Sequence, residues 1–239
     1  MFFKNLRGRS VFMRHVSSMS VGLTLGSIGL AWFTVGCGSS SSDAKVRLIN
    51  ANPDVSGLNL LVDTKSSASG VGYGAASSYI VVSAASHELQ AVPSNSSTPL
   101  IDTTLSFASS SNVSLISANY SFNVMSIVLD DNNAAPPSGD FKLRIVNVSP
   151  GMGAQDVYVV TSGTNINGAD PIFSSLGFGS ASSYVTLGAG SYDIVFTPPG
   201  SKFVNLASTN TLGAGQIRTV LALNNPTGSY EAAVLSDVN

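Results

Sequence analysis

The sequence predicts an all-β protein: two tandem immunoglobulin-like antiparallel β-sandwiches that follow an N-terminal signal helix. Val, Ile, Thr and Tyr are frequent, and Gly, Pro and Asn interrupt the apolar segments about every eight to twelve residues, as in short strands joined by turns. Helix caps followed by a 3.6-residue apolar period are absent after the signal segment. Many short strands with such turns favour sandwiches.

An internal repeat shows that there are two of them. Gly72–Tyr79 (GYGAASSY) recurs as Gly177–Tyr184 (GFGSASSY), and Lys45–Pro53 (KVRLINANP) recurs as Lys142–Pro150 (KLRIVNVSP). Further matches follow downstream in the same order. The unit of about 95 residues is too long for a solenoid repeat and has the length of a small domain. We therefore expect one whole domain to be duplicated.

These observations divide the chain into five segments. We expect a signal peptide over residues 1–36, a Ser-rich tether over 37–44, a first sandwich over 45–131, a linker over 132–140 and a second sandwich over 141–239. The linker is rich in Pro and Asx residues, so few contacts should cross it and each sandwich should fold independently.

Strands are expected where apolar residues alternate or run together between turn residues. The expected strands of the first copy are 46–50, 58–62, 79–82, 89–92, 100–107, 113–118 and 122–129, with 66–76 as a Gly- and Ser-rich loop. Those of the second copy are 141–148, 156–160, 184–187, 192–196, 216–223 and 230–235. Tyr79 and Tyr184 end the matched octapeptides, so we expect equivalent positions for them, with both rings packed inside their sandwiches.

The first 36 residues have the pattern of a secretory signal. Four basic residues precede the apolar run Val21–Val35, which is shorter than the 20 or so residues that a transmembrane helix needs. Translation could begin at Met1 or at Met13, and the second start would give a more compact signal. Cys37 follows the run and is the single Cys of the chain, which excludes an intramolecular disulfide.

Cys37 and its surroundings resemble the signal of bacterial lipoproteins. The residues are Thr34-Val35-Gly36-Cys37, followed by a Ser-rich stretch. The resemblance implies that Cys37 is lipidated and becomes the mature N-terminus, so that the membrane is a partner through this anchor. Gly38 stands where Asp would imply retention in the inner membrane, so the resemblance favours the outer membrane of the bacterial cell envelope.

The charge of the mature chain argues against nucleic acid as a partner. After Cys37, seven Lys and Arg remain against all 13 Asp and Glu, which leaves a net charge of about −6. Nucleic-acid-binding proteins carry clusters of Lys and Arg, and no such cluster remains.

The repeated motifs resemble the DUF4397 domain. They are KVRLINANPD with LNLLVD in the first copy and KLRIVNVSP with QDVYVV in the second, followed by the GYGAASSY or GFGSASSY octapeptide. The resemblance covers most of residues 45–239. It implies an exported bacterial protein with no established activity, and it supplies no catalytic residue.

The residue types of common catalytic sites give no consistent pattern. His87 is the single His after the signal, and its repeat counterpart is Tyr192, so we expect it to be dispensable for activity. No G-x-S-x-G motif is present to support a Ser nucleophile. Asp130–Asn133 lacks the spacing of a calcium loop, and the glycine pairs lack the third Gly of a dinucleotide loop. We therefore expect no metal and no cofactor.

Carboxylates leave one alternative open. A glycosidase needs two of them across a cleft. The sequence offers Asp54, Asp63, Glu88, Asp102, Asp156 and Asp193. Our prediction is a non-enzymatic, lipid-anchored envelope protein with a binding, adhesion or structural role, whose partner is an envelope glycan or a protein. The alternative is an exported carbohydrate-active hydrolase that uses a carboxylate pair.

Overall fold

The computed structural model describes residues 43–225 and 227–237. The predicted signal helix, Cys37 and nearly all of the tether lie outside these residues. Within the described part the regular structure is strand apart from two short 3-10 helices, and no helix there is long and apolar enough to cross a membrane.

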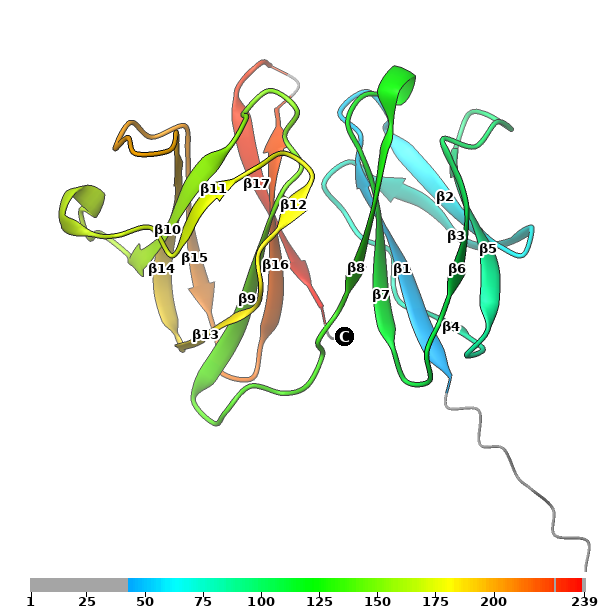
Figure 1. Ribbon diagram of the computed structural model, residues 1–239, viewed down its shortest axis with the longest axis horizontal. Helices are drawn as coiled ribbons and strands as arrows, with labels where there is room; N and C mark the ends of the chain where they lie inside the picture. Colours follow the sequence, from blue (N-terminus) through cyan, green and yellow to red (C-terminus); the bar gives the residue numbers. More distant parts are fainter. Residues whose placement is uncertain (1–42, 226, 238–239) are drawn as a thin grey trace, which may run out of the picture. The chain divides into compact units, whose positions relative to one another are not determined.

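The first sandwich begins at residue 44 and ends at residue 130. It contains β1 (Ala44–Ala51), β2 (Gly57–Val62), β3 (Lys65–Gly72), β4 (Ile80–Val82), β5 (Ser86–Pro93), β6 (Ile101–Ser106), β7 (Asn112–Ala118), the short 3-10 helix η1 (Ser121–Asn123) and β8 (Met125–Asp130). One sheet has the order β4-β1-β7-β8 and the other has the order β3-β2-β5-β6 (Figure 1).

The second sandwich repeats this arrangement. It contains β9 (Asp140–Asn147), β10 (Gln155–Thr161), the short 3-10 helix η2 (Ile166–Gly168), β11 (Phe173–Leu176), β12 (Ser180–Ala181), β13 (Val185–Gly188), β14 (Gly190–Thr197), β15 (Leu206–Leu212), β16 (Ile217–Asn224) and β17 (Tyr230–Ser236). The sheet orders are β12-β9-β16-β17, with β13 also paired to β9, and β11-β10-β14-β15.

The predicted fold is confirmed, with one addition to the antiparallel pattern. In each copy the first strand pairs in parallel with the strand before the last: β1 with β7, and β9 with β16. A parallel pair needs a long crossover connection. Here that crossover consists of the strands between them, β2–β6 in the first copy and β10–β15 in the second.

The prediction of a loop over residues 66–76 is wrong for most of its length. Strand β3 forms a hairpin with β2 through the two-residue turn Asp63–Thr64. Both residues have positive φ, 49° and 65°, as hairpin turns of this kind require. The sequence hides the hairpin because neither turn residue is Gly and because Gly and Ser dominate β3. Strand β15 also went unpredicted, since the four consecutive residues 208–211 are all polar and leave no apolar alternation.

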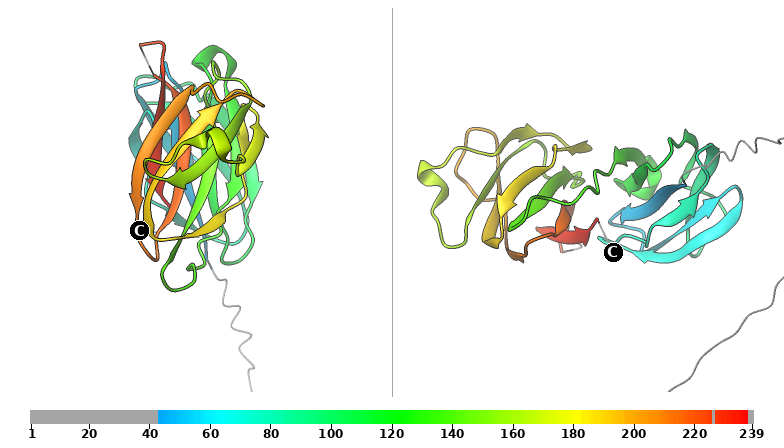
Figure 2. Two further views of the ribbon diagram at one scale, coloured as in Figure 1. Left: turned by 90° about the vertical axis from the view of Figure 1, so that its left-hand side faces the viewer. Right: turned by 90° about the horizontal axis from the view of Figure 1, so that it is seen from below.

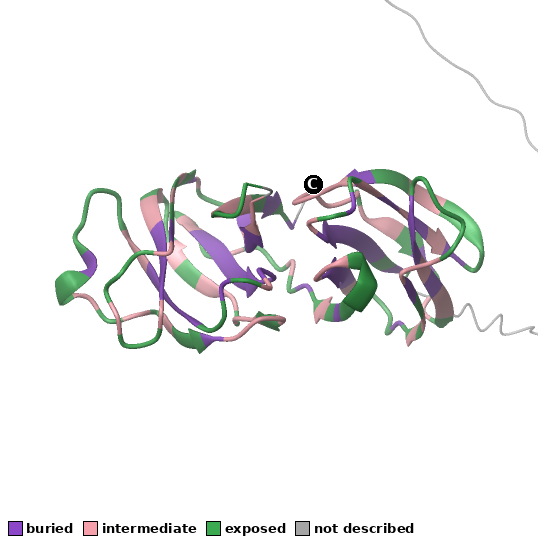
Figure 3. Ribbon diagram, turned by 90° about the horizontal axis from the view of Figure 1, so that it is seen from above, coloured by how far each residue is buried: buried purple, intermediate pink, exposed green. Residues whose placement is uncertain are grey.

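Each sandwich has its own apolar core. The inward residues of the first include Leu48, Leu60, Leu89 and Leu115, which are fully buried. The corresponding core of the second copy is built from residues such as Leu143, Ile145, Ile194 and Phe196. Figure 3 shows this burial as purple central strands in each sandwich, with exposed loops in green.

A third core joins the two sandwiches and corrects the prediction of few contacts between them. It includes Ile49 and Ile116 from the first copy and Val146 and Leu221 from the second. These residues lie on β1, β7, β9 and β16, whose other faces already line the cores within the sandwiches. Both faces of these strands are therefore buried, and the view from below in Figure 2 shows the red C-terminal strand reaching the first sandwich beside the blue strand β1.

The linker between β8 and β9 is exposed over most of its length, but it is tied to the fold at two points. Asp131 is buried, with 6% of its surface exposed. The Lys142 ammonium donates to the carbonyl oxygens of Asn132 and Ala134, at 2.6 and 3.0 Å. These contacts fix the start of the linker against the second sandwich.

Candidate functional site

Four charged side chains meet between the sandwiches. Arg47 on β1 donates from Nη2 to Oδ1 of Asp237 over 2.6 Å. Arg144 on β9 donates from Nη2 to Oδ1 of Asp131, also over 2.6 Å. Asp131 follows β8 and Asp237 follows β17, so each Arg pairs with the carboxylate at the end of the other copy. None of the four side chains is more than 3% exposed.

Uncharged donors complete the site around Asp131. The Tyr79 hydroxyl donates to Oδ2 of Asp131 over 2.6 Å, and the Ser114 hydroxyl donates to the same atom over 2.6 Å. Arg47 donates from Nε to the Ser114 oxygen over 2.7 Å, and its guanidinium carbon lies 4.9 Å from the centre of the Tyr79 ring. The first copy thus surrounds the carboxylate with hydrogen-bond donors.

The second copy does the same for Asp237. The Tyr184 hydroxyl and the Thr219 hydroxyl each donate to Oδ2 of Asp237 over 2.6 Å. Arg144 donates from Nε to the Thr219 oxygen over 3.2 Å, and its guanidinium carbon lies 4.7 Å from the Tyr184 ring centre. Tyr79 and Tyr184 occupy equivalent positions as predicted, but both rings lie at the joint between the copies rather than inside a sandwich.

The cluster holds these groups in the protonation states that its hydrogen bonds need. Burial raises the pKa of Tyr79 and of Tyr184 well above the usual value; Asp131 and Asp237 add to this rise, Arg47 and Arg144 oppose it, and both hydroxyls remain donors. Burial alone would lower the pKa of Arg47, but attraction to Asp237, with Tyr79 and Asp131, more than offsets this and raises it. Two buried cations and two buried anions therefore balance one another.

Glycine is required at this joint in the repeated octapeptide. Gly74 and Gly179 have positive φ, 71° and 77°. A Cβ at Gly179 would lie 2.6 Å from Sδ of Met125, and one at Gly74 would lie 3.1 Å from Cδ1 of Leu223. In both cases the neighbour belongs to the other copy. The residues that define the repeat thus serve the contact between the copies, which makes this cluster structural.

A Ser–His–Asp arrangement lies on the first sandwich, which the sequence did not predict. Nδ1 of His87 lies 2.7 Å from Oδ2 of Asp63, and its Nε2 lies 2.9 Å from Oγ of Ser83. These distances fit the geometry of a nucleophile, a base and an orienting carboxylate. The side chain of Asp63 is 52% exposed, unlike the buried carboxylate of serine hydrolases.

The second copy gives this arrangement a structural explanation. Nε2 of His87 also lies 3.1 Å from the carbonyl oxygen of Ser83, an acceptor that needs a donor. At the equivalent place, the Tyr192 hydroxyl donates to the carbonyl oxygen of Gly188 over 2.7 Å. Both rings therefore close the turn that precedes their strand. When His87 Nε2 carries the proton for its hydrogen bond to the Ser83 carbonyl oxygen, it cannot also accept a proton from the Ser83 hydroxyl.

The candidate carboxylates are dispersed, and several of them fix turns. Asp156 accepts from the backbone N–H of Ser175 and of Gly200, both at 2.8 Å. Asp193 accepts from Thr209 Oγ1, the Gly163 N–H and Ser162 Oγ, and these bonds lower its pKa.

Two candidate carboxylates do come close together. The Gln90 amide donates to Glu88 at 3.2 Å and to Asp102 at 3.1 Å, on the outer face of β5 and β6. The side chain of Gln90 fills the space between them, and neither acid lines the cavity described next.

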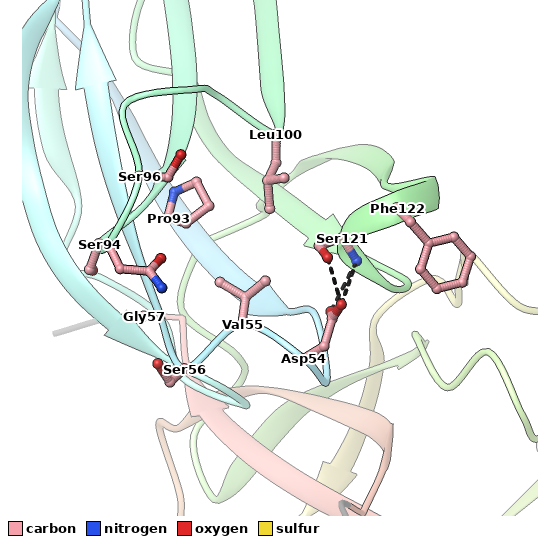
Figure 4. A pocket seen from close by; sticks show the side chains of 11 residues that line it. Asp54, Val55, Ser56, Gly57, Pro93, Ser94, Ser96, Leu100, Ser121 and Phe122 are labelled. Carbon is pink, nitrogen blue, oxygen red and sulfur yellow. Dashed lines mark hydrogen bonds between the residues drawn. The ribbon is translucent and has the colours of Figure 1, made fainter.

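That cavity lies among the loops at one end of the first sandwich (Figure 4). Its volume is about 530 Å³. Asp54 closes one wall: its carboxylate accepts the backbone N–H of Ser121 at 3.0 Å and the Ser121 hydroxyl at 2.6 Å. The lining residues are Asp54, Val55, Ser56, Gly57, Pro93, Ser94, Asn95, Ser96, Leu100, Ser121 and Phe122.

An exposed Phe ring, stacked on a half-buried Tyr, stands at the rim of this cavity. Phe122 on η1 is 84% exposed, and its ring stacks on that of Tyr120 with a centroid distance of 5.7 Å and an interplanar angle of 13°. In Figure 4 the Phe122 ring points outward from the loop. Asn224 of the second copy donates to the Tyr120 hydroxyl at 3.5 Å and accepts at its carbonyl from Tyr73, so the joint between the copies supports the pair.

The second copy does not repeat the two side chains that define this site. Gly151 stands at the repeat position of Asp54, and residues 225–229, which correspond to the Phe122 loop, include no aromatic residue. Within the described residues, no group of three or more His, Cys, Asp or Glu side chains converges in a way that could hold a metal ion. Cys37, the one site residue predicted from sequence, lies outside the described residues.

Comparison with protein families finds one match. The model of the family described as "Domain of unknown function (DUF4397)" matches residues 44–158 and 160–239. The two segments meet inside β10, whereas the structure places the boundary between the sandwiches at the linker before β9. A search of curated proteins finds no match.

Solved structures show a distant likeness. A family CBM26 module from Eubacterium rectale Amy13K, in complex with maltoheptaose, is 10% identical with a TM-score of 0.28, and the alignment covers 82% of this chain and 98% of that one. Streptococcal family 41 carbohydrate-binding modules that recognise α-glucan are 11% identical with a TM-score of 0.26, covering 77% and 95%. A putative adhesin from Bacteroides ovatus is 8% identical with a TM-score of 0.20, covering 82% and 94%. At these values the likeness does not extend to function.

Proposed function

This chain belongs to the DUF4397 family, in two tandem copies, and we propose that it is a lipid-anchored protein of the bacterial cell envelope that binds a neutral glycan without catalysis. The anchor is Cys37 and the outer membrane is its location. The residues that support this are the basic region, the apolar run Val21–Val35 and the Ser-rich segment that follows Cys37.

The observation that carries the binding role is the exposed Phe122 ring beside the cavity, stacked on the half-buried Tyr120. An aromatic ring that is 84% exposed gains nothing for folding, and exposed apolar surface beside polar groups marks interaction sites. Its stacked partner holds the Phe122 ring in place, which reduces the entropy lost on binding. The pair is thus a preorganised apolar surface of the kind that binds the flat face of a ligand.

The lining of the cavity favours a neutral, hydroxylated ligand. Its polar groups are Ser hydroxyls and the Asn95 amide, which can both donate and accept hydrogen bonds. Asp54 is the one charged side chain among the lining residues, and it already accepts from Ser121. With no cation in the lining, an anionic ligand would find no partner. A sugar unit combines hydroxyls with an apolar ring face and fits both parts of the site.

The hydrolase alternative needs a second carboxylate at the same cavity. Glycosidases place two carboxyl groups about 5–9.5 Å apart across the bond that is cleaved. Asp54 has no such partner among the lining residues. The close pair Glu88 and Asp102 lies on a strand face, with Gln90 between its members. We therefore favour binding over hydrolysis.

A binding titration tests this function. The chain from residue 38 onward is titrated with a panel of neutral oligosaccharides of different linkage and with neutral peptides, by calorimetry. Phe122→Ala should weaken oligosaccharide binding at least tenfold. Phe203→Ala is the matched control, because this ring is 72% exposed in the second copy, away from the cavity, and its loss should change nothing.

Three outcomes would contradict the proposal. If the peptides bind and the oligosaccharides do not, the partner is a protein rather than a glycan. An equal loss of oligosaccharide affinity in Phe122→Ala and Phe203→Ala would show that the cavity is not the binding site. Release of reducing ends from a bound oligosaccharide would show that the hydrolase alternative is correct.

A further inference from the structure

The joint between the copies is reciprocal. Each copy contributes one Arg, one Asp, one Tyr and one hydroxyl residue, at matching positions of the repeat. The first copy supplies Arg47, Tyr79, Ser114 and Asp131, and the second supplies Arg144, Tyr184, Thr219 and Asp237. Each Arg crosses to the other copy, whereas each Tyr reaches the carboxylate of its own copy. Exchanging the two copies would leave the pattern of contacts unchanged.

Such reciprocity is the property of an isologous interface, in which the same surface patch meets itself about a two-fold axis. A contact between two unrelated domains has no reason to show it. We infer that the joining face of each copy is self-complementary, and that the partner it fits is a second copy of the same half. The tandem chain thus contains the interface of a homodimer inside one polypeptide.

The charges show why a half can pair with itself. If two first copies met through this face, Arg47 of one would reach Asp131 of the other, and the reverse contact would form at the same time. The hydroxyl donors to each carboxylate already come from its own copy, through Tyr79 and Ser114. Every buried charge would again have an opposite charge, which a buried site requires.

The apolar residues explain why the native chain pairs unlike halves. Ala118 of the first copy corresponds to Leu223 of the second, and Ile127 corresponds to Ala233. All four belong to, or pack against, the core between the sandwiches. At each of these two positions, one copy thus has a small side chain and the other copy has a large one. If two identical halves met, the position with two small side chains would leave a cavity, and the position with two large side chains would be overpacked. Like halves should therefore pair only when the unlike contact is blocked.

Charge reversal in one copy provides that block within the full chain. With Arg47→Asp and Asp131→Arg, the face of the first copy opposes that of the second with equal charges at both contacts. Each face still complements itself. The chain from residue 38 onward should then associate to at least twice its single-chain mass by light scattering while it retains its strand content by circular dichroism. A reversed chain that keeps its strands and its single-chain mass would overturn the inference.

Reversal in both copies is the matched control. Adding Arg144→Asp and Asp237→Arg makes the two faces opposite again, so the single-chain mass should return. A dimer in this variant too would show non-specific association and would also count against self-complementarity.

If the reversed charges prevent folding, a second protein made of two first copies tests the self-complementarity of the face. It joins residues 43–139 to another copy of residues 43–131, so that every residue at the joint is native. A self-complementary face predicts a soluble monomer with one thermal transition. Two separate transitions or an insoluble chain would overturn the inference.

Discussion

Arg47 near the start of the first copy and Asp237 at the end of the second form a buried ion pair, with Nη2 and Oδ1 separated by 2.6 Å. Arg47 also donates from Nη1 to the carbonyl oxygen of Ser236 over 2.6 Å. The beginning and the end of the described chain are thus joined across the sandwiches. The physical consequence is that each buried carboxylate has its nearest guanidinium in the other copy, at 2.6 Å, whereas the Arg of its own copy lies at 3.8 or 3.9 Å.

Arg47→Met should therefore lower the free energy of unfolding by about 3–5 kcal/mol, the usual cost of removing one partner of a buried ion pair. The change leaves the buried Asp237 with only the more distant Arg144 guanidinium, 3.9 Å away, as a cation. The control is Arg218→Met, since Arg218 contacts Ser236 at the surface and its loss should cost under about 0.5 kcal/mol. Urea denaturation of the chain from residue 38 onward measures both. Equal effects of the two substitutions would mean that the ion pair contributes little.

Tyr79→Ala and Tyr184→Ala should each shift one common thermal transition. Both rings lie at the joint, and each hydroxyl donates to a buried carboxylate. Because the rings are partly exposed, we expect a loss of about 2–4 kcal/mol in each case. Calorimetry of both variants provides the measurement. Two transitions, each sensitive to one Tyr only, would restore the independent domains that the sequence suggests.

The sequence revealed the fold class and the duplication because both depend on local patterns. Turn residues at short intervals predict a sandwich, and the repeated octapeptide predicts two. It did not reveal the β2–β3 hairpin, since its turn is Asp63–Thr64, without the Gly that usually marks positive φ. The joint was missed for a different reason. A short alternating strand such as β1 shows two faces, but the sequence does not say that a second domain covers the polar one.

The cluster and the cavity were equally hidden. Asp131 and Asp237 lie just beyond strands, where an acid usually faces water, and only the fold brings them to Arg144 and Arg47. One signal was available: Arg, Tyr and the terminal Asp recur in both copies, in positions where an exposed surface would not require them. The Tyr120–Phe122 pair has no counterpart in the repeat, so comparing the copies could have singled out this loop as different.

Membrane attachment through Cys37 is the prediction that lies outside the described residues. Cys37→Ala should prevent lipidation, and the protein should move from the membrane fraction to the soluble or unprocessed fraction. Cell fractionation with metabolic lipid labelling tests this. Ser40→Ala, in the adjoining tether, serves as the control and should remain membrane-bound. A Cys37→Ala protein that is processed and retained as in the wild type would exclude the lipoprotein anchor.

Asp193 should contribute stability that depends on pH. Hydrogen bonds from Thr209, the Gly163 N–H and Ser162 lower its pKa in the folded state below the usual value of about 3.9. A lowered folded pKa means that the contribution is fully present above the unfolded pKa and is lost as pH falls through the folded pKa. Asp193→Asn should therefore reduce the melting temperature at pH 6. The difference from the wild type should shrink once the pH falls below about 4. A difference that stays constant down to pH 2 would mean that the carboxylate charge is not involved.

His87→Tyr should leave both folding and ligand binding unchanged. The second copy places Tyr192 at this position, and the Tyr192 hydroxyl donates to the Gly188 carbonyl oxygen. In the first copy, His87 Nε2 is placed to donate to the Ser83 carbonyl oxygen in the same way. The substituted ring can therefore make the same turn-closing bond. Ser83→Ala is the companion variant, because it removes the hydroxyl that a nucleophile would need and leaves the carbonyl in place. The melting temperature, the oligosaccharide titration and an assay of ester and glycoside hydrolysis should give the same values for both variants as for the wild type. Hydrolysis that is present in the wild type and lost in both variants, with the fold retained, would assign Ser83, His87 and Asp63 a catalytic role.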